Sequence, residues 1–215
     1  MAETSWPTPR PFLKNVKDAF ARSGSVERLV LLSSSGAQFR QGVGEIKTNN
    51  AAERILTDTN VPTVIFVRCA YFMENWTANL DPLRSPQPFF YSTVTPLDWK
   101  MPMLMGRTMP AMKPHIFELH GPRLYSLLDV QQAFCTALGK QISIKPVERA
   151  DLDAFFSRIF PPQIVGEWVE MATCFLPGGV VAADSISYDD VSVQRGTTEL
   201  VDAITSAVDV GFERV

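Results

Sequence analysis

Residues 28–36 read RLVLLSSSG, and residues 63–75 read TVIFVRCAYFMEN. Each stretch begins with a short apolar run that stops abruptly at polar, small or aromatic side chains. Short runs with apolar residues at successive positions are typical of strands buried on both faces in a parallel sheet. We therefore predict two such strands, at residues 29–32 and 63–67.

The segment between the two strands has the spacing of an amphipathic helix. Over residues 45–59, apolar side chains recur at intervals of three and four: Ile46, Ala52, Ile55 and Leu56. Asn60-Val61-Pro62 then breaks the helix. Strand, helix and strand together predict one βαβ unit with a right-handed crossover. In such folds ligands bind at the carboxyl ends of the strands.

Three blocks of this region resemble, in order, the NmrA-like family of atypical short-chain dehydrogenase/reductases, which bind NADP or NAD. They are LLSS at 31–34, TNNAAERIL at 48–56 and VRCAYFMEN at 67–75. The similarity continues through HGPR at 120–123 and LGK at 138–140, so it covers most of the chain from about residue 12. The resemblance implies an α/β fold: the C-terminal part of a Rossmann-type parallel sheet with a small α+β substrate lobe.

The same resemblance divides the chain and suggests its first site residues. We expect an extended leader at 1–11, a truncated Rossmann-like domain at 12–112 and a C-terminal substrate lobe at 113–215 that is mixed with the first domain. NmrA-like proteins commonly carry a cofactor-contacting lysine four residues before the glutamate that matches Glu53; here Asn49 holds that position. Lys47 cannot replace it, because two steps along a helix point to nearly the opposite face. Ser33 ends the first strand where cofactor can lie.

The block after the second strand corresponds to the family's cofactor-contacting loop, which comprises Tyr71, Phe72, Met73, Glu74 and Asn75. A hydride-transfer enzyme that reduces a carbonyl needs a proton donor near the oxygen. No Tyr-x-x-x-Lys pair occurs, so Tyr71 is the catalytic candidate by position. Structural interpretations stay open: Asn49 as helix surface, the aromatic residues as core, and Asn75 and Ser33 as local caps.

The chain lacks the Gly-x-Gly-x-x-Gly turn on which dinucleotide pyrophosphates usually bind. Gly42-Val43-Gly44 has no third glycine and reads as a turn before a helix. The resemblance places four further strands before Phe12, and we expect them to be absent. Two consequences are expected. Binding of NADP or NAD should be weak, and the uncovered edge of strand 29–32 should demand a second copy or a strand-supplying partner.

Composition excludes several function classes. The 215 residues carry a net charge of −3, and 20% of them are charged. This composition does not indicate the basic surface that nucleic-acid binding requires. No run approaches the roughly 18 apolar residues of a membrane span, and the N-terminus is no signal peptide. Cys69, Cys135 and Cys174 are odd in number and lack metal spacing, which favours a cytoplasmic protein with free thiols. His115 and His120 fall on opposite faces of a predicted strand, so no metal site is predicted.

Periodicity and breakers predict the remaining elements. Helices are expected at 12–22, 71–80, 127–138, 151–160, 163–176 and 197–208, and strands at 89–91, 115–120 and 141–147. Two functions remain open. The first is an NAD(P)-dependent oxidoreductase that acts on a small organic carbonyl or alkene, with secondary metabolism as the expected setting. The second is a non-catalytic NAD(P)-sensing or partner-binding regulatory protein, or an inactive truncated member of the family, which the missing turn and Asn49 favour.

Overall fold

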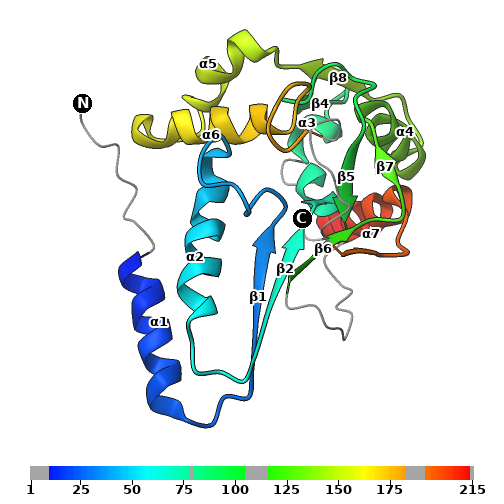
Figure 1. Ribbon diagram of the computed structural model, residues 1–215. Helices are drawn as coiled ribbons and strands as arrows, with labels where there is room; N and C mark the ends of the chain where they lie inside the picture. The colour runs from blue at the N-terminus through cyan, green and yellow to red at the C-terminus, as the bar shows by residue number, and fades with distance from the viewer. Residues whose placement is uncertain (1–9, 78–79, 105–115, 183–191, 214–215) are drawn as a thin grey trace. The chain divides into compact units, whose positions relative to one another are not determined.

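A computed structural model describes residues 10–77, 80–104, 116–182 and 192–213 (Figure 1). These residues form two compact units. The first unit draws on the described parts of Met1–Cys69, Pro110–Glu118 and Asp153–Val193, and the second on those of Ala70–Met109, Leu119–Leu152 and Gln194–Val215. The domain boundary predicted after residue 112 lies outside the described residues, as does the leader up to residue 9. The last two residues of that leader, Arg10 and Pro11, already belong to helix α1 (Arg10–Ser23).

The first unit contains the predicted βαβ unit. Strand β1 (Arg28–Ser34) is followed by the 3-10 turn η1 (Gly44–Ile46), helix α2 (Lys47–Thr57) and strand β2 (Thr63–Cys69). The two strands are parallel over their full length, from the pair Arg28 and Thr63 to the pair Ser34 and Cys69. The two strands predicted from the apolar runs, and the helix predicted between them, are therefore confirmed.

Helices α1 and α2 lie side by side in Figure 1 and share one apolar core with the two strands. Buried Leu13 of α1 and Leu56 of α2 meet Phe66 of β2, together with Leu29 and Leu31 of β1. Alternate residues of a strand face opposite sides of the sheet, so only one face of β1 enters this core. The amphipathic helix predicted at 12–22 is confirmed.

The opposite face of β1 corrects the prediction of a strand buried on both sides. Val30 is 39% exposed and Leu32 is 58% exposed. In the described part of the chain, the four-stranded sheet has the order β1-β2-β6-β9, with β6 at Ile116–His120 and β9 at Val193–Arg195, so β1 is the outer strand of the described sheet. The apolar run correctly predicted a strand. Burial of its second face would require a covering layer, which a run of apolar residues cannot itself supply.

Helix α6 (Pro162–Cys174) packs on the loop that leads from β1 to α2. A second cluster joins Ala37, Val43 and Ile46 of this segment to Cys174 and Val181. The approach is close at Gly44, which has a φ of 53°. A Cβ there would lie 2.0 Å from the backbone oxygen of Glu167, so no larger residue fits. The loop beyond the carboxyl end of β1 is thereby held against α6.

The second unit is built from short strands and two longer helices. Strands β3 (Tyr71–Phe72), β5 (Met101–Leu104) and β7 (Leu124–Tyr125) form one sheet, and β4 (Phe89–Ser92) pairs in parallel with β8 (Ser143–Pro146). Helix α4 (Leu127–Leu138) begins at a capping box in which Ser126 and Asp129 exchange hydrogen bonds. It ends at Gly139 in the left-handed conformation, as the sequence predicts.

The other helices follow the predicted segments with shorter or shifted bounds. They are η2 (Met73–Thr77), η3 (Arg149–Asp151), α5 (Leu152–Phe156) and α7 (Leu200–Glu213). The short helix α3 (Asp81–Arg84) was not predicted, because Asp81-Pro82 was interpreted as the end of the preceding helix. The helix predicted at 71–80 is wrong in its first two residues, which form β3. Besides β3, three further strands, β5, β7 and β9, were not predicted. His115 and the methionines at 105, 109 and 112 lie outside the described residues.

No helix in the described part of the chain combines the length and the apolar character needed to cross a bilayer. The described residues also contain no group of three or more His, Cys, Asp or Glu side chains placed to hold a metal ion.

The contact between η1 and α6 leads to a first prediction, because it buries acidic oxygens. Glu45 Oε2 and Glu167 Oε2 are both buried and have no hydrogen-bond partner among the described residues. Burial, and then the charge of Glu167, raise the pKa of Glu45, while Lys47 opposes the shift. A raised pKa means that the folded protein holds this proton more tightly than the unfolded chain does. Stability from this group is therefore lost as the pH rises through the raised pKa.

We expect Glu45→Gln to raise the melting temperature at pH 7, because it removes an ionised group from a buried, like-charged setting. The gain should shrink as the pH falls below the ordinary pKa of a glutamate, where the wild-type side chain is protonated too. Thermal melts between pH 4 and pH 8, roughly spanning the titration, measure both effects. Exposed Glu148→Gln is the control and should change little. A melting temperature that falls in Glu45→Gln at pH 7 would contradict the interpretation.

Candidate functional site

The carboxyl ends of β1 and β2 carry a buried polar cluster. Arg68, near the end of β2, donates from Nε to Glu53 Oε1 at 3.0 Å and from Nη2 to Glu53 Oε2 at 2.7 Å. Arg68 is 7% exposed and Glu53 of α2 is 5% exposed. Two parallel N–H bonds to one carboxylate give both strength and a fixed orientation. The pair thus fastens α2 to β2 at the carboxyl edge of the sheet.

Ser33 and Gln38 complete the bonding of this pair. Ser33 Oγ at the end of β1 donates to Glu53 Oε1 at 2.6 Å. Arg68 Nη1 reaches forward to Gln38 Oε1, 3.3 Å away in the loop after β1. Ser33 therefore has a structural hydrogen bond within the chain. Its predicted contact with cofactor has not been tested and stays a prediction.

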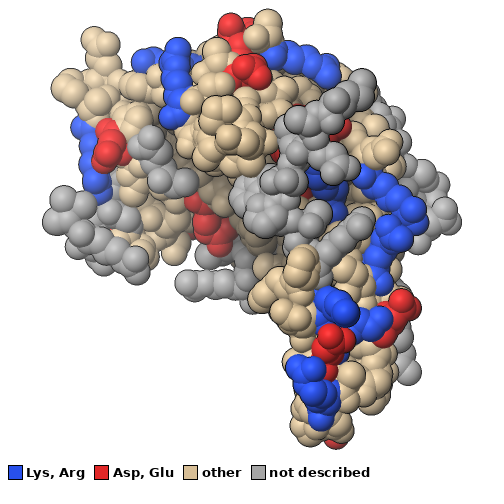
Figure 2. Space-filling view, turned by 90° about the vertical axis from the view of Figure 1, so that its left-hand side faces the viewer, with Lys and Arg blue, Asp and Glu red and all other residues tan. Residues whose placement is uncertain are grey.

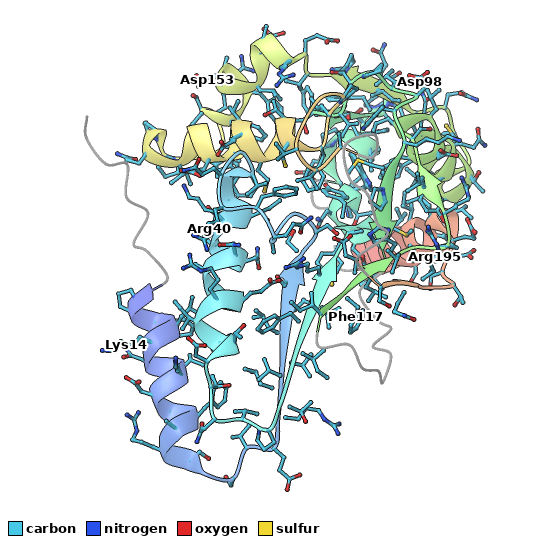
Figure 3. All side chains as sticks on the ribbon, in the orientation of Figure 1. Lys14, Arg40, Asp98, Phe117, Asp153 and Arg195 are labelled. Atoms are coloured by element: carbon cyan, nitrogen blue, oxygen red, sulfur yellow. The ribbon has the colours of Figure 1, made fainter. Side chains whose placement is uncertain are left out.

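Two further contacts hold the loop beyond β1. Ser35 Oγ lies 3.1 Å from Glu118 Oε2 of β6 and donates to it, and Asn50 Nδ2 donates to the carbonyl oxygen of Ala37 at 2.7 Å. Between Ser35 and Val43 the only charged residue is Arg40, which is exposed (Figure 3). The loop is thus anchored to α2 and β6 by neutral donors and one buried acid, while its single cation remains at the surface.

Asn49 stands out among these polar residues. It is half-buried, and its side-chain amide makes no hydrogen bond to any described residue. It lies one turn before Glu53 on α2, so the two side chains share a face of the helix. Because Glu53 meets the ends of both strands, Asn49 projects at the same carboxyl edge. Lys47 turns away from this edge and ion-pairs with Glu167 of α6, as expected from its position two residues earlier.

Tyr71 and the residues after it belong to the second unit. The Tyr71 ring is half-buried and packs against Trp76, with 5.2 Å between ring centroids. Burial raises the pKa of Tyr71 to about 12, against a smaller opposing effect of its hydrogen bond with the Asn75 side chain. Tyr71 therefore keeps its proton throughout the neutral pH range. In a proton transfer it can serve there as the acid and not as the base.

The rest of this loop has mixed exposure. Met73 is fully buried in the core of the second unit, whereas Phe72 and Glu74 are half-buried and Asn75 is exposed. Any ligand contact of Met73 would thus come from its backbone. The loop is a two-residue strand followed by the 3-10 turn η2. The cofactor-binding roles of Tyr71, Phe72, Met73, Glu74 and Asn75 remain predictions.

A hollow lies on another part of the first unit, between α1 and α2. It has a volume of about 830 Å³ and is lined by Lys14, Lys17, Asp18, Ala51, Arg54, Ile55, Thr57 and Asp58. Figure 2 shows basic and acidic side chains interspersed on the lower part of this face, at the height of α1. The hollow is open and its charges have both signs. We therefore take the strand ends as the candidate site, because the polar groups there are buried and ordered by hydrogen bonds.

Sequence reasoning missed the central pair of the cluster. In the sequence, Glu53 served only to locate Asn49 four residues before it, and Arg68 only to mark the end of an apolar run. One signal was available: Arg68 interrupts a β-branched run one residue before its last apolar position, Cys69, and a charge there needs a buried partner. Glu118 carries the same signal, since it lies between Phe117 and Leu119 in a predicted strand, whereas Gln38 carries none.

No protein-family model matches this chain. No curated protein matches it either. Solved structures do. An NADPH-dependent quinone oxidoreductase from Escherichia coli superimposes with a TM-score of 0.60 at 18% identity, over 94% of this chain and 73% of that one. Leucoanthocyanidin reductase from Vitis vinifera gives a TM-score of 0.65 at 12% identity, over 96% and 77% of the two chains.

Isoflavone reductase is a third such structure, with a TM-score of 0.60 at 10% identity over 90% of this chain and 69% of its own. All three neighbours are oxidoreductases, and the first is NADPH-dependent. This chain has their Rossmann-type α/β fold. The fold that the sequence blocks implied is therefore confirmed. At these identities the likeness concerns the fold, and what each relative acts on is a property of that relative.

The buried pair gives a second prediction. Arg68→Met should lower the free energy of unfolding by about 3–5 kcal/mol, because it leaves the Glu53 carboxylate buried without its cation. Adding Glu53→Gln should recover part of this loss, since the introduced amide is neutral and its oxygen can still accept from Ser33. Urea unfolding measures both variants.

The matched control is an ion pair at the surface of the same unit. Lys17 and Asp58 lie 3.9 Å apart, and their side chains are 34% and 78% exposed. Lys17→Met should therefore cost less than about 1 kcal/mol. An Arg68→Met variant no less stable than Lys17→Met would show that the buried pair does not hold the edge together.

Proposed function

We propose that this protein is an NAD(P)-dependent oxidoreductase that reduces a small organic carbonyl or alkene, with NADP as its cofactor. The observation that carries the proposal is Asn49, a half-buried amide with no hydrogen-bond partner among the described residues. It lies at the carboxyl edge of a parallel sheet, where ligands of such folds bind. A cytoplasmic location and a substrate from secondary metabolism belong to the same proposal, on the resemblance alone.

The described residues fit one half of the cofactor better than the other. An amide both donates and accepts, which suits the paired hydroxyl groups of a ribose. The pyrophosphate usually needs a glycine-rich turn and a helix N-terminus, and this chain has no Gly-x-Gly-x-x-Gly. The exposed Arg40 is the only cation in the loop after β1. We therefore assign recognition of the nicotinamide ribose to Asn49, and expect little contribution from the pyrophosphate.

NADPH, when bound, supplies the hydride of such a reduction. The chain must then supply the proton. With a carbonyl substrate the proton goes to the developing oxygen anion, and with an alkene it goes to the carbon next to the one that received the hydride. Tyr71 is our proposed donor. Its raised pKa keeps the hydroxyl protonated at neutral pH. The packing of its ring against Trp76 limits rotation of the side chain.

A second function has its own support. A pKa of about 12 makes the Tyr71 hydroxyl a weak acid, and Asn49 has no positive charge to stabilise an anion. Both features are compatible with a protein that senses NAD(P) or binds a partner without turnover. The two proposals agree on a ribose contact at Asn49 and differ on catalysis by Tyr71.

The binding prediction uses the two halves of the cofactor as separate probes. Reduced nicotinamide mononucleotide should bind, whereas 2′,5′-ADP should not. NADPH should bind weakly, because its adenosine and phosphate groups find few contacts. Asn49→Ala should weaken mononucleotide binding about 2- to 10-fold, as the loss of one hydrogen bond of about 0.5–1.5 kcal/mol implies. Titration calorimetry measures the binding of the three ligands to the wild-type protein and of the mononucleotide to Asn49→Ala.

Asn60→Ala is the matched control, since Asn60 is exposed beyond the other end of α2. It should leave binding unchanged. Micromolar or tighter binding of NADPH would contradict the expected weakness and would require another anion site. Equal affinity for the mononucleotide in wild type and Asn49→Ala would remove Asn49 from the site.

The catalytic prediction follows NADPH oxidation by absorbance with quinones and α,β-unsaturated ketones as substrates. Tyr71→Phe should reduce the turnover rate about 10²- to 10⁴-fold, the usual contribution of a positioned proton donor. Tyr91→Phe is the control, because Tyr91 is 48% exposed on β4. Binding of nucleotide without turnover by the wild-type protein would favour the sensing function instead.

A further inference from the structure

Trp76 is a half-buried tryptophan of the second unit, and its ring packs on that of Tyr71. It belongs to the 3-10 turn η2, which carries the chain back over the tyrosine. Thr77 stabilises this turn, because its Oγ1 donates to the carbonyl oxygen of Glu74 at 2.8 Å. The planes of the two rings are inclined by 49°. The contact is therefore one of the tilted arrangements that aromatic pairs prefer over a face-to-face sandwich.

The indole is held at its polar end by a buried methionine. Trp76 Nε1 donates to Met103 Sδ at 3.4 Å, and Met103 is fully buried. The carbonyl oxygen of Met103 accepts from the backbone N–H of Gly121 at 2.7 Å, so the methionine is itself tied to the chain around it. An indole has one N–H, which points in one direction from the ring. A bond from that group to a fixed acceptor therefore selects one orientation of the Trp76 ring.

Met103 is also the residue of β5 that lies beside Tyr71. Strand β3 has only two residues, Tyr71 and Phe72, and both pair with β5. So short a ladder places the backbone at Tyr71 but leaves the direction of its ring to the side-chain torsions. The contact with Trp76 restrains those torsions. Because Trp76 is bonded to Met103, the ring and the backbone of Tyr71 are both held relative to the same residue.

Buried aromatic side chains support Trp76 from the core of the second unit. Its ring meets Phe90 of β4 edge-on, with 5.9 Å between centroids, and Phe90 packs on Phe134 of α4 at 5.3 Å. Phe90 is 5% exposed and Phe134 is fully buried. A close-packed core leaves such rings little room to move. Trp76 is thus a rigid support between this core and the half-buried Tyr71.

We propose that Trp76 is a positioning residue, which holds the Tyr71 ring in one orientation for proton transfer to the substrate. The inference rests on the proposed function, since it concerns the same proton donor. A donor is effective only when its hydroxyl lies within hydrogen-bond distance of the atom that receives the proton. A displacement of about 1 Å can cost about 10²-fold in rate. Trp76 acts through Tyr71, because its own N–H is bonded to Met103.

Steady-state kinetics with NADPH, and with quinones and α,β-unsaturated ketones as substrates, separate positioning from substrate binding. Trp76→Ala should lower kcat about 10- to 10²-fold and leave KM largely unchanged. Trp76→Phe keeps an aromatic ring and should recover most of kcat. Trp168→Ala is the matched control, because Trp168 is a half-buried tryptophan of the first unit that stacks on Phe160 at 4.2 Å. It should leave kcat unchanged.

Met103→Leu tests the bond to sulfur, because it removes the acceptor and nearly conserves the volume. Trp76→Phe removes the donor of the same bond. If the two residues act together, the double variant should have a kcat no lower than that of the slower single variant. Independent, multiplying losses would contradict a shared role. Circular dichroism verifies that each variant is folded, and this cycle decides the proposal if Trp76→Ala does not fold.

A spectroscopic test does not depend on turnover. At about pH 10.5, Tyr71 should be protonated in the wild-type protein, since its pKa is about 12 and not the ordinary 10.0. Trp76→Ala uncovers the ring, so the pKa should fall and most of the hydroxyl should ionise. NMR of tyrosine labelled at Cζ reads the ionisation, and Tyr71→Phe assigns the signal. Tyr125 is the internal reference, because burial, together with its bond to Glu199, raises its pKa to about 12 as well.

Two further results would overturn the proposal. The first is a Tyr71 that stays equally protonated at about pH 10.5 in the wild-type protein and in folded Trp76→Ala. The second is a higher KM with unchanged kcat in Trp76→Ala, which would make Trp76 a substrate-binding residue. A folded wild-type protein without turnover would contradict the proposed function instead. The NMR comparison would then still decide whether Trp76 fixes Tyr71.

Discussion

The buried bond between Arg68 and Glu53 is the interaction on which the rest of the first unit depends. It joins β2 to α2, and through Ser33 it also includes the end of β1. Each charge is buried, so each is acceptable only while its partner remains in place. Small displacements of α2 along the strands would break two N–H bonds together. The pair therefore fixes the position of the helix more tightly than apolar packing alone does, because apolar contacts tolerate sliding.

This constraint determines what the carboxyl edge can present to a ligand. Arg68 and Glu53 neutralise each other and use their hydrogen-bonding groups on one another, on Ser33 and on Gln38. Their fixed positions in turn orient the first turn of α2, where Asn50 is bonded to Ala37 and Asn49 is not bonded to any described residue. An uncharged amide held in place by a charged pair behind it suits a neutral polyol better than a phosphate. This geometry supports our proposal that Asn49 contacts the ribose and not the pyrophosphate.

The parts of this fold that sequence predicted are those with local causes. Strands β1 and β2 and helices α1, α2 and α4 each carry enough periodic apolar residues, or a cap as clear as Ser126, to be recognised alone. Strands β5, β7 and β9 have two to four residues each, and they are strands only because a distant segment pairs with them. The Arg68–Glu53 bond escaped for a similar reason. Fifteen residues separate its members, and no local pattern states that an arginine ending a strand will meet a glutamate on the preceding helix.

The error about β1 has a more general physical basis. A run such as Leu29-Val30-Leu31-Leu32 shows that both faces of the strand carry apolar side chains. The burial of each face depends on what packs against it. Leu29 and Leu31 meet the helices, while Val30 and Leu32 remain exposed beside an open edge. Apolar residues on the second face give the folded monomer little stability and make the edge prone to association. The two faces therefore have different roles. One stabilises the βαβ unit that carries Asn49, and the other remains exposed in the described part of the chain.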